Sequence, residues 1–169
     1  MKLIFLDIDG VLNTDFYLKE SDRHVGPEFY PGAIKLLEEV IVETDAKVVI
    51  SSTWRHGTSK KELVDLFRNY SDIIANAIIG KTGYYPSISR DRWVEILFYI
   101  AYLLKKGKNV TNIVILDDDY FDLEPLSEYL VLCRKNNMRG LRYHMKHEVM
   151  KKLKSRFFIE FRGYENKNS

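Results

Sequence analysis

Five aspartates directly follow two short apolar runs of the sequence. Asp7 and Asp9 follow the run 3–6, and Asp117–Asp119 follow the run 113–116. Carboxylates that lie close together repel one another unless a proton or a cation lies between them, and hard oxygen ligands of this kind favour Mg²⁺. The residue types and their positions therefore indicate a metal site, provided that both runs end at the same edge of the fold.

The apolar runs are typical of strands in a parallel sheet that is buried on both faces, because they are short and show no polar alternation. We expect five such strands, at 3–6, 47–50, 77–80, 113–116 and 129–132. Apolar residues at helical spacing predict helices at 31–43, from Ser59 onwards with Glu62 in a capping box, at 93–104 and at 145–153. This alternation predicts an α/β fold with right-handed crossovers and a mostly parallel sheet. Ligands of such a sheet bind beyond the carboxyl ends of its strands, where the aspartates and the serines after 47–50 would meet.

The segment Phe5–Leu12 resembles the nucleophile motif of the haloacid dehalogenase (HAD) superfamily of phosphotransferases, which reads Asp-x-Asp-Gly followed by an apolar pair. A strand that ends in serine, a basic residue on a later helix and a strand that ends in paired aspartates match the other three motifs of the superfamily. Within it, four segments are similar to the small cap-less domains associated with RNA-repair proteins, which are relatives of the phosphatase half of polynucleotide kinase-phosphatases: 48–55, 92–96, 115–119 and 140–141. The resemblance covers roughly residues 1–153. It implies a three-layer Rossmann-like HAD fold with a mostly parallel sheet of about five strands and no cap domain.

The resemblance also implies a phosphohydrolase that depends on Mg²⁺. Asp7 would be the nucleophile that forms an aspartyl-phosphate, and Asp9 would protonate the leaving oxygen and later deprotonate the attacking water. The implied protein ligands of Mg²⁺ are the Asp7 carboxylate, the Asp9 backbone carbonyl and the Asp117 carboxylate, with Asp118 assisting directly or through a water. The alternative for Asp7 and Asp9 is a turn after the strand in which both act as local caps.

A serine and a basic residue would contact the transferred phosphoryl group. Ser51 and Ser52 differ by one residue of strand register, and we expect Ser52 to be the catalytic donor, with Ser51 as the alternative contact to the substrate. Arg92 fits the basic position of the family, with Arg90 as its substitute. The alternatives are that both serines only cap the following turn and that Arg92 is a solvated surface residue.

Trp54 and Arg55 follow the serines, and we expect both at the rim of the site. There the indole could stack on a base and the guanidinium could hold a second phosphate of the substrate. Packing of Trp54 over the edge of the sheet is the alternative. We interpret the histidines and basic residues of 144–156 as a solvated helix face, with a nucleic-acid patch as the alternative for the basic ones.

The composition is that of a globular domain. Of the 169 residues, 46% are apolar, 30% are charged and one is a cysteine, and the net charge is +2. These values exclude intrinsic disorder, an internal disulfide and a large basic field. The length has room for one domain, and with the resemblance it implies a single HAD-like phosphatase domain at 1–160 followed by a polar tail at 161–169. The apolar start of the chain is too short for a signal peptide, and no apolar stretch is long enough to span a bilayer. We therefore expect a cytoplasmic protein with no membrane partner.

The lengths of two intervals bear on the substrate. Larger members of the superfamily carry a cap after the nucleophile strand or after the serine motif, but here the intervals 11–30 and 53–90 have no space for a domain. Without a cap the site would stay open to water, which suits a phosphate on a macromolecule. We expect a polynucleotide 3′-phosphate or a nucleotide as substrate. The alternatives are a phosphoprotein or small-molecule phosphatase, and a non-catalytic nucleic-acid-binding module on the same fold.

Overall fold

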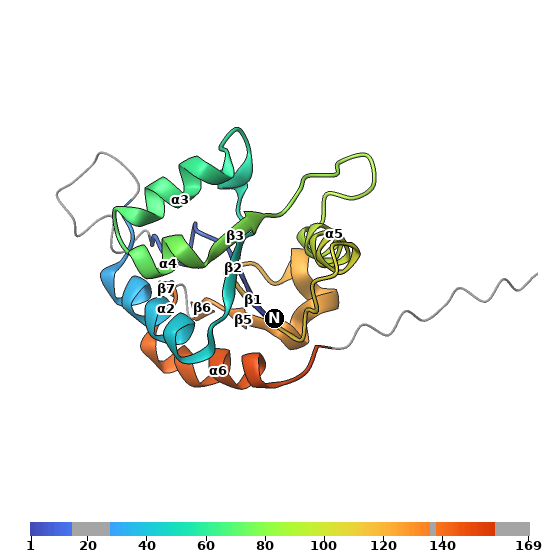
Figure 1. Ribbon diagram of the computed structural model, residues 1–169. Coiled ribbons are helices and arrows are strands. Elements are labelled where there is room, and N and C mark those ends of the chain that lie inside the picture. The colour runs from blue at the N-terminus through green and yellow to red at the C-terminus, as the bar shows by residue number, and fades with distance from the viewer. Residues whose placement is uncertain (15–27, 136–137, 158–169) are drawn as a thin grey trace, which may run out of the picture.

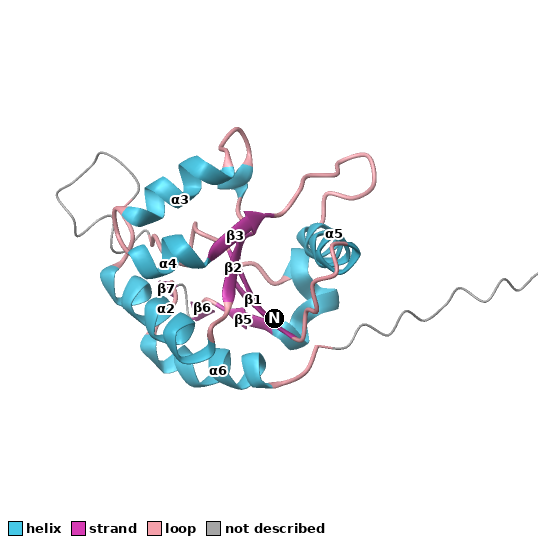
Figure 2. Cartoon of the chain, viewed as in Figure 1, coloured by secondary structure: helices cyan, strands magenta, loops and turns pink. Residues whose placement is uncertain are grey.

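The computed structural model describes residues 1–14, 28–135 and 138–157, and at its centre is a five-stranded sheet (Figure 1, Figure 2). The strands are β1 (Lys2–Leu6), β2 (Lys47–Ile50), β3 (Ile78–Lys81), β4 (Asn112–Asp117) and β5 (Leu130–Leu132). Their order is β3-β2-β1-β4-β5, and every neighbouring pair is parallel. The α/β class and the parallel sheet of five strands are therefore confirmed.

Helices cover both faces of this sheet and make it the middle of three layers (Figure 1). One face carries α2 (Pro31–Thr44), α3 (Lys60–Arg68), α4 (Asp72–Ala77) and α6 (Lys146–Lys154), and the other carries α5 (Arg92–Lys105). Three 3₁₀ segments and one antiparallel strand pair complete the described elements: η1 (Thr53–Arg55), η2 (Phe121–Tyr129), η3 (Tyr143–Met145), β6 (Arg134–Lys135) and β7 (Met138–Arg139). Between β2 and α5 the chain forms only η1, α3, α4 and β3, so no further domain is inserted there.

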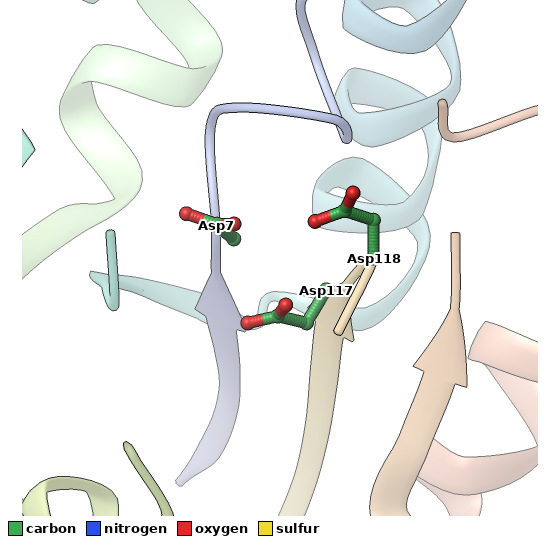
Figure 3. A group of neighbouring side chains, drawn as sticks. All are labelled: Asp7, Asp117 and Asp118. Carbon is green, nitrogen blue, oxygen red and sulfur yellow. The ribbon is translucent and has the colours of Figure 1, made fainter. Parts of the chain in front are cut away.

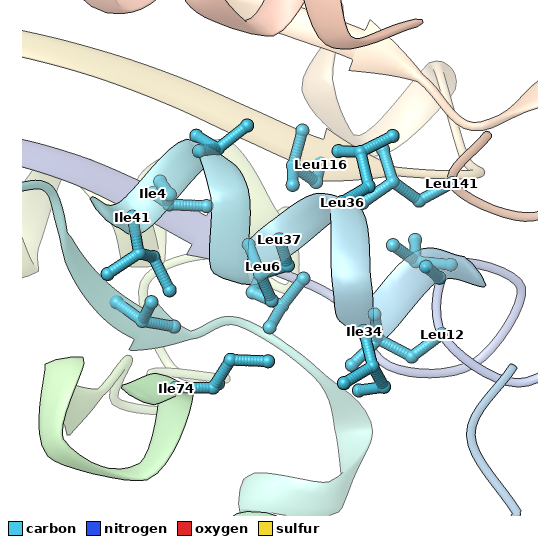
Figure 4. Close-up of a cluster of buried hydrophobic side chains, with 14 of the residues drawn as sticks. Ile4, Leu6, Leu12, Ile34, Leu36, Leu37, Ile41, Ile74, Leu116 and Leu141 are labelled. Carbon is cyan, nitrogen blue, oxygen red and sulfur yellow. The ribbon is translucent and has the colours of Figure 1, made fainter. Parts of the chain in front are cut away.

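The core is divided by the sheet into two apolar clusters. Ile4 and Leu6 of β1 face α2, and Figure 4 shows Ile4 beside Ile41 and Leu6 beside Leu37 of that helix. Leu3 and Phe5 belong to the cluster on the α5 side, because successive strand residues point to opposite faces. Asp7, which continues this odd-numbered set, is therefore expected on the α5 side of the sheet.

The strand register places four polar residues in one row at the carboxyl edge of the sheet. Leu6 pairs with Ile50 and with Leu116, and Ile50 pairs with Lys81. The residues that follow these four in the sequence are, in the order of the strands, Thr82, Ser51, Asp7 and Asp117. Backbone hydrogen bonds of 2.8–2.9 Å continue the pairing, from Ser51 to Leu6, from Asp7 to Leu116 and from Thr82 to Ile50. The row is thus part of the sheet, and its members share the face that α5 covers.

The expected helices are present, and α3 shows the cap that its sequence predicts. The Ser59 hydroxyl accepts a hydrogen bond from the Glu62 amide at 3.2 Å, and the Glu62 carboxylate accepts one from the Ser59 amide at 2.7 Å. The helix α4 and the segment η2 are not predicted by the sequence pattern, because both are too short or too irregular to show a helical period. The predicted tail at 161–169 and part of the interval 11–30 lie outside the described residues. Within the described chain, no helix has both the length and the apolar character needed to cross a bilayer.

Candidate active site

Three carboxylates meet at the carboxyl ends of β1 and β4 (Figure 3). One oxygen each of Asp7, Asp117 and Asp118 lies within 4.8 Å of the others, and the side chains of Asp7 and Asp117 are buried. The shared register of β1 and β4 brings Asp7 and Asp117 side by side, and Asp118 follows in the chain. Hard oxygen donors in this arrangement fit a divalent cation such as Mg²⁺. The predicted convergence of the two acidic segments is confirmed.

Arg92 lies between two of these carboxylates. Its Nη1 is 3.2 Å from Oδ2 of Asp7 and 2.6 Å from Oδ2 of Asp117, and it also donates to the backbone oxygen of Ser51 at 3.0 Å. Arg92 is the first residue of α5, the helix that covers the face of the row, which explains how it reaches both strands. Arg90, its expected substitute, is exposed and forms no ion pair with any residue that the structure describes.

Burial sets the electrostatics of this cluster. It raises the pKa of Asp117 to about 7, Arg92 acts against this rise, and the charge of Asp7 adds to it. Burial acts to lower the pKa of Arg92, but the charges of Asp117 and Asp7 prevail and raise it above its usual range. The guanidinium therefore stays charged, and a proton or cation stabilises the carboxylates around it.

Asp118 forms the outer side of the cluster. Its Oδ2 is 3.2 Å from Nε of Arg139, the last residue of β7. Gly10 approaches it so closely that a Cβ on this residue would lie 2.4 Å from the Asp118 carboxylate, and the backbone of Gly10 has a φ of +76°. Both facts explain why the Asp-x-Asp-Gly motif needs glycine at this point.

Asp9 lies apart from the three clustered carboxylates. Its side chain is exposed, with Oδ2 accepting from Nε1 of Trp54 and Oδ1 from Nδ2 of Asn13, each at 2.8 Å. Trp54 is half-buried, and its ring centroid is 6.3 Å from that of Phe29. The indole ring therefore packs against Phe29, and its Nε1–H donates a hydrogen bond that orients Asp9.

The two serines after β2 have different surroundings. The Ser52 hydroxyl accepts from the backbone amide of Trp54 at 3.4 Å and thereby caps η1. The Ser51 hydroxyl is buried without a hydrogen-bond partner among the described residues, and so is that of Thr82. Both belong to the row that contains Asp7. Thr82 was not a candidate from the sequence, since only the pairing of β2 with β3 reveals its position.

The expected rim position of Arg55 is not what the structure shows, and this expectation is corrected. Arg55 is buried, with Nη2 at 2.7 and 2.6 Å from the carboxylate oxygens of Glu95, whose side chain is fully buried. Its Nη1 donates to the backbone oxygen of Ser52 at 2.6 Å, and Lys81 donates to the backbone oxygen of Arg55 at 2.7 Å. The guanidinium thus attaches residues 51–55, called the serine loop below, to α5, and it is not available to a second phosphate.

Glu95 is a further residue of the site that the sequence reasoning missed. It lies one helical turn after Arg92, and its neighbours on the inner face of α5 are apolar. A lone acid on such a face needs a buried partner, and this is the signal that could have revealed it. The basic residues after position 144 lie elsewhere: Lys146 pairs with Glu39 and Glu43, at 2.8 and 2.6 Å.

Comparison with known proteins gives one family. Residues 3–143 match the model of the HAD domain in Swiss Army Knife RNA repair proteins. The comparison with curated proteins finds no relative that matches the chain.

Proposed function

Since the chain belongs to the family of HAD domains in Swiss Army Knife RNA repair proteins, we propose that it is a metal-dependent phosphohydrolase that removes a phosphate monoester from a polynucleotide end. The observation that carries the proposal is the cluster of Asp7, Asp117 and Asp118, in which Asp7 and Asp117 are buried and both contact Arg92. A binding module has no use for a buried, mutually repelling set of acids, whereas phosphoryl transfer needs a nucleophile, a cation and a positive side chain at one point.

Asp7 and Asp9 carry the covalent steps of the proposed reaction. The Asp7 carboxylate attacks phosphorus in line, and the bond from phosphorus to the leaving oxygen breaks as Asp9 gives this oxygen a proton. Asp9 then takes a proton from a water, which attacks the aspartyl-phosphate, releases inorganic phosphate and restores Asp7. The hydrogen bonds from Trp54 and Asn13 hold Asp9 in place for both proton transfers.

The three clustered carboxylates and Arg92 supply the metal site and the positive charge that the proposed reaction needs. Asp7, Asp117 and Asp118 would hold Mg²⁺ together with the backbone oxygen of Asp9, and the ion would neutralise charge on the phosphoryl oxygens. Arg92 stabilises the same oxygens from the side of α5 with its two-pronged guanidinium.

We infer that Ser51, in place of the expected Ser52, donates to the phosphoryl group. Its hydroxyl belongs to the row of Asp7 and lacks a partner among the described residues, whereas the hydroxyl of Ser52 is engaged by the amide of Trp54.

The test is the release of phosphate from an aryl phosphate and from a 3′-phosphorylated oligonucleotide. We expect turnover by the wild type with Mg²⁺, its loss in chelator with recovery on adding the ion, and a loss of at least a thousand-fold in Asp7→Asn. Asp122→Asn, which changes an exposed acid outside the cluster, is the matched control. Equal rates for wild type and Asp7→Asn would show that Asp7 is not the nucleophile. Turnover of sugar phosphates without any of the oligonucleotide would refute the substrate, and no turnover at all would refute the enzyme.

A further inference from the structure

A hollow of about 550 Å³ lies between the start of α2 and the segment η3, apart from the acidic cluster. The side chains around it that matter here are Tyr30, Lys35, Glu39, Arg142 and Tyr143. The hollow has the size of a small-ligand pocket, and none of its residues takes part in the proposed catalytic steps.

Both walls of the hollow are attached to the loop that follows the nucleophile. The amide of Tyr30 donates to the backbone oxygen of Leu12 at 2.7 Å, and the amide of Leu141 donates to that of Val11 at 2.8 Å. On the second wall, Arg139 pairs with Asp118 at 3.2 Å, only three residues before Arg142. The hollow is therefore attached on both sides to segments that adjoin the acidic cluster.

The charge around the hollow is positive. Neither Lys35 nor Arg142 forms a hydrogen bond or ion pair through its side chain anywhere in the described parts of the chain. The acid Glu39 interacts electrostatically with Lys35, but its main partner is Lys146 at 2.8 Å, a contact that compensates its charge and holds the pKa of Glu39 below its usual value. The first turn of α2 contains no acidic residue either. Two cations are thus left to attract an anionic ligand.

Two aromatic rings accompany these cations. Tyr143 is 70% exposed and Tyr30 is 41% exposed, a large exposure for aromatic residues at a hollow. The ammonium of Lys146 lies 5.9 Å from the centroid of the Tyr143 ring and adds a third positive charge beside it. Unpaired cations that track phosphates, combined with rings on which bases stack, are the features by which proteins bind single-stranded nucleic acid. A phosphorylated sugar would use the cations but has no base that could stack on the exposed ring of Tyr143.

We propose that this hollow binds the nucleotides next to the phosphorylated end of a single-stranded polynucleotide. Lys35 and Arg142 contact backbone phosphates, and Tyr143 stacks on a base with Tyr30 beside it. The inference rests on the proposed function, because it assigns the binding of the chain whose terminal phosphate the acidic cluster removes. It also predicts affinity for the product, which has lost the terminal phosphate but keeps the rest of the strand.

The experiment measures binding of a fluorescein-labelled 12-nucleotide strand with a 3′-hydroxyl by fluorescence anisotropy, in an RNA arm and a DNA arm. The variants are Lys35→Gln/Arg142→Gln and Tyr143→Ala. The matched control is Lys105→Gln/Lys108→Gln, which removes two exposed lysines at the far end of α5, about 20 Å along the helix from Arg92. Thermal melting of each variant establishes that it is folded.

The salt dependence distinguishes the two kinds of contact. For a single strand, log K falls with log salt, and each lost phosphate contact makes this negative slope shallower by about 0.7. Lys35→Gln/Arg142→Gln should therefore make the slope shallower by about 1.4 and weaken binding about ten-fold or more. Tyr143→Ala weakens binding between about five-fold and about 150-fold and leaves the slope unchanged. The control retains the affinity and the slope of the wild type.

Weakened binding of these variants in either arm supports the site, and a weakening in the RNA arm alone assigns it to RNA. Affinities and slopes equal to those of the control in both arms overturn the inference. So does binding of the wild type to a phosphopeptide but not to either strand. Failure of the proposed function is a separate result, because it is read from phosphate release by the wild type, whereas the inference is read from binding by the variants.

Discussion

The buried ion pair of Arg55 and Glu95 allows a sharp prediction about what holds the active site together. Glu95→Ala removes the carboxylate that accepts two hydrogen bonds from the Arg55 guanidinium, at 2.7 and 2.6 Å. The guanidinium is then left buried with a full charge and only the backbone oxygen of Ser52 as acceptor. We expect Glu95→Ala to be one of the most destabilising single substitutions in the protein.

The magnitude follows from the burial of both partners. Removing one partner of a buried pair costs about 3–5 kcal/mol, because the other charge stays in an apolar environment. For a domain of this size each kcal/mol lowers the melting temperature by about 2–4 °C, so we expect a fall of roughly 6–20 °C. The exposed pair Lys61–Asp65 on α3 is the control, since Asp65→Ala breaks a 2.7 Å contact in water and should cost less than about 1 kcal/mol.

The double variant Arg55→Leu/Glu95→Leu separates stability from positioning. Replacing both charges by apolar side chains removes the uncompensated charge, so most of the lost free energy of unfolding should return, apart from about 1 kcal/mol for the donor that Ser52 loses. The serine loop then loses its link to α5 through Arg55 and keeps the contact from Arg92 to the backbone oxygen of Ser51, and we expect a lower kcat in a folded protein. Urea unfolding followed by circular dichroism measures the free energy, and aryl phosphate hydrolysis measures kcat. If Glu95→Ala is no more destabilising than Asp65→Ala, the reasoning is refuted.

Two further predictions concern the polar row at the carboxyl edge of the sheet and the serine next to it. Ser51→Ala should lower kcat by about 100-fold and raise the free energy of unfolding by about 1 kcal/mol, because it removes a buried hydroxyl that has no partner among the described residues. Ser52→Ala should instead destabilise by about 1 kcal/mol through loss of its cap, and the reverse pattern in unfolding and kinetics would favour Ser52 as the donor. In chelator, stability should fall as the pH rises from about 4 to 7, because folded Asp117, with a raised pKa of about 7, keeps a proton that the unfolded chain releases near its ordinary value of 3.8. Melting temperatures measured across this range should show a smaller slope in Asp117→Asn, where Asp118, whose pKa burial also raises, still contributes, and an unchanged slope would contradict the assignment.

The sequence predicts the strand ends well, because the sheet is built from apolar runs that stop where polar residues begin. Asp7 and Asp117 meet as expected, since parallel strands that end together bring the following residues to one edge. The choice between Ser51 and Ser52 is different. It depends on which residue of β2 pairs with Leu6, and the short apolar run 48–50 fits either register equally well.

The burial of Arg55 shows a second limit. An arginine five residues after a strand end looks like a rim residue as long as its partner is unknown. That partner, Glu95, is 40 positions away in the sequence, and only the packing of α5 on the sheet brings the two together. Long-range charge pairs of this kind leave no periodic signal, whereas the helix itself does.

The helix α5 is what turns a row of polar side chains into one site. It places two opposite charges one turn apart: Arg92 beside Asp7 and Asp117, and Glu95 beside Arg55. Exchanging these two residues would keep the composition and the helix, yet it would put a third acid against the buried carboxylates and two guanidinium groups against each other. Their order along the helix therefore matters as much as their chemistry. Both contacts hold the serine loop, since Arg92 donates to the backbone oxygen of Ser51 and Arg55, which Glu95 binds, donates to that of Ser52. A displacement of α5 would therefore disturb the phosphate donor and the acidic cluster together.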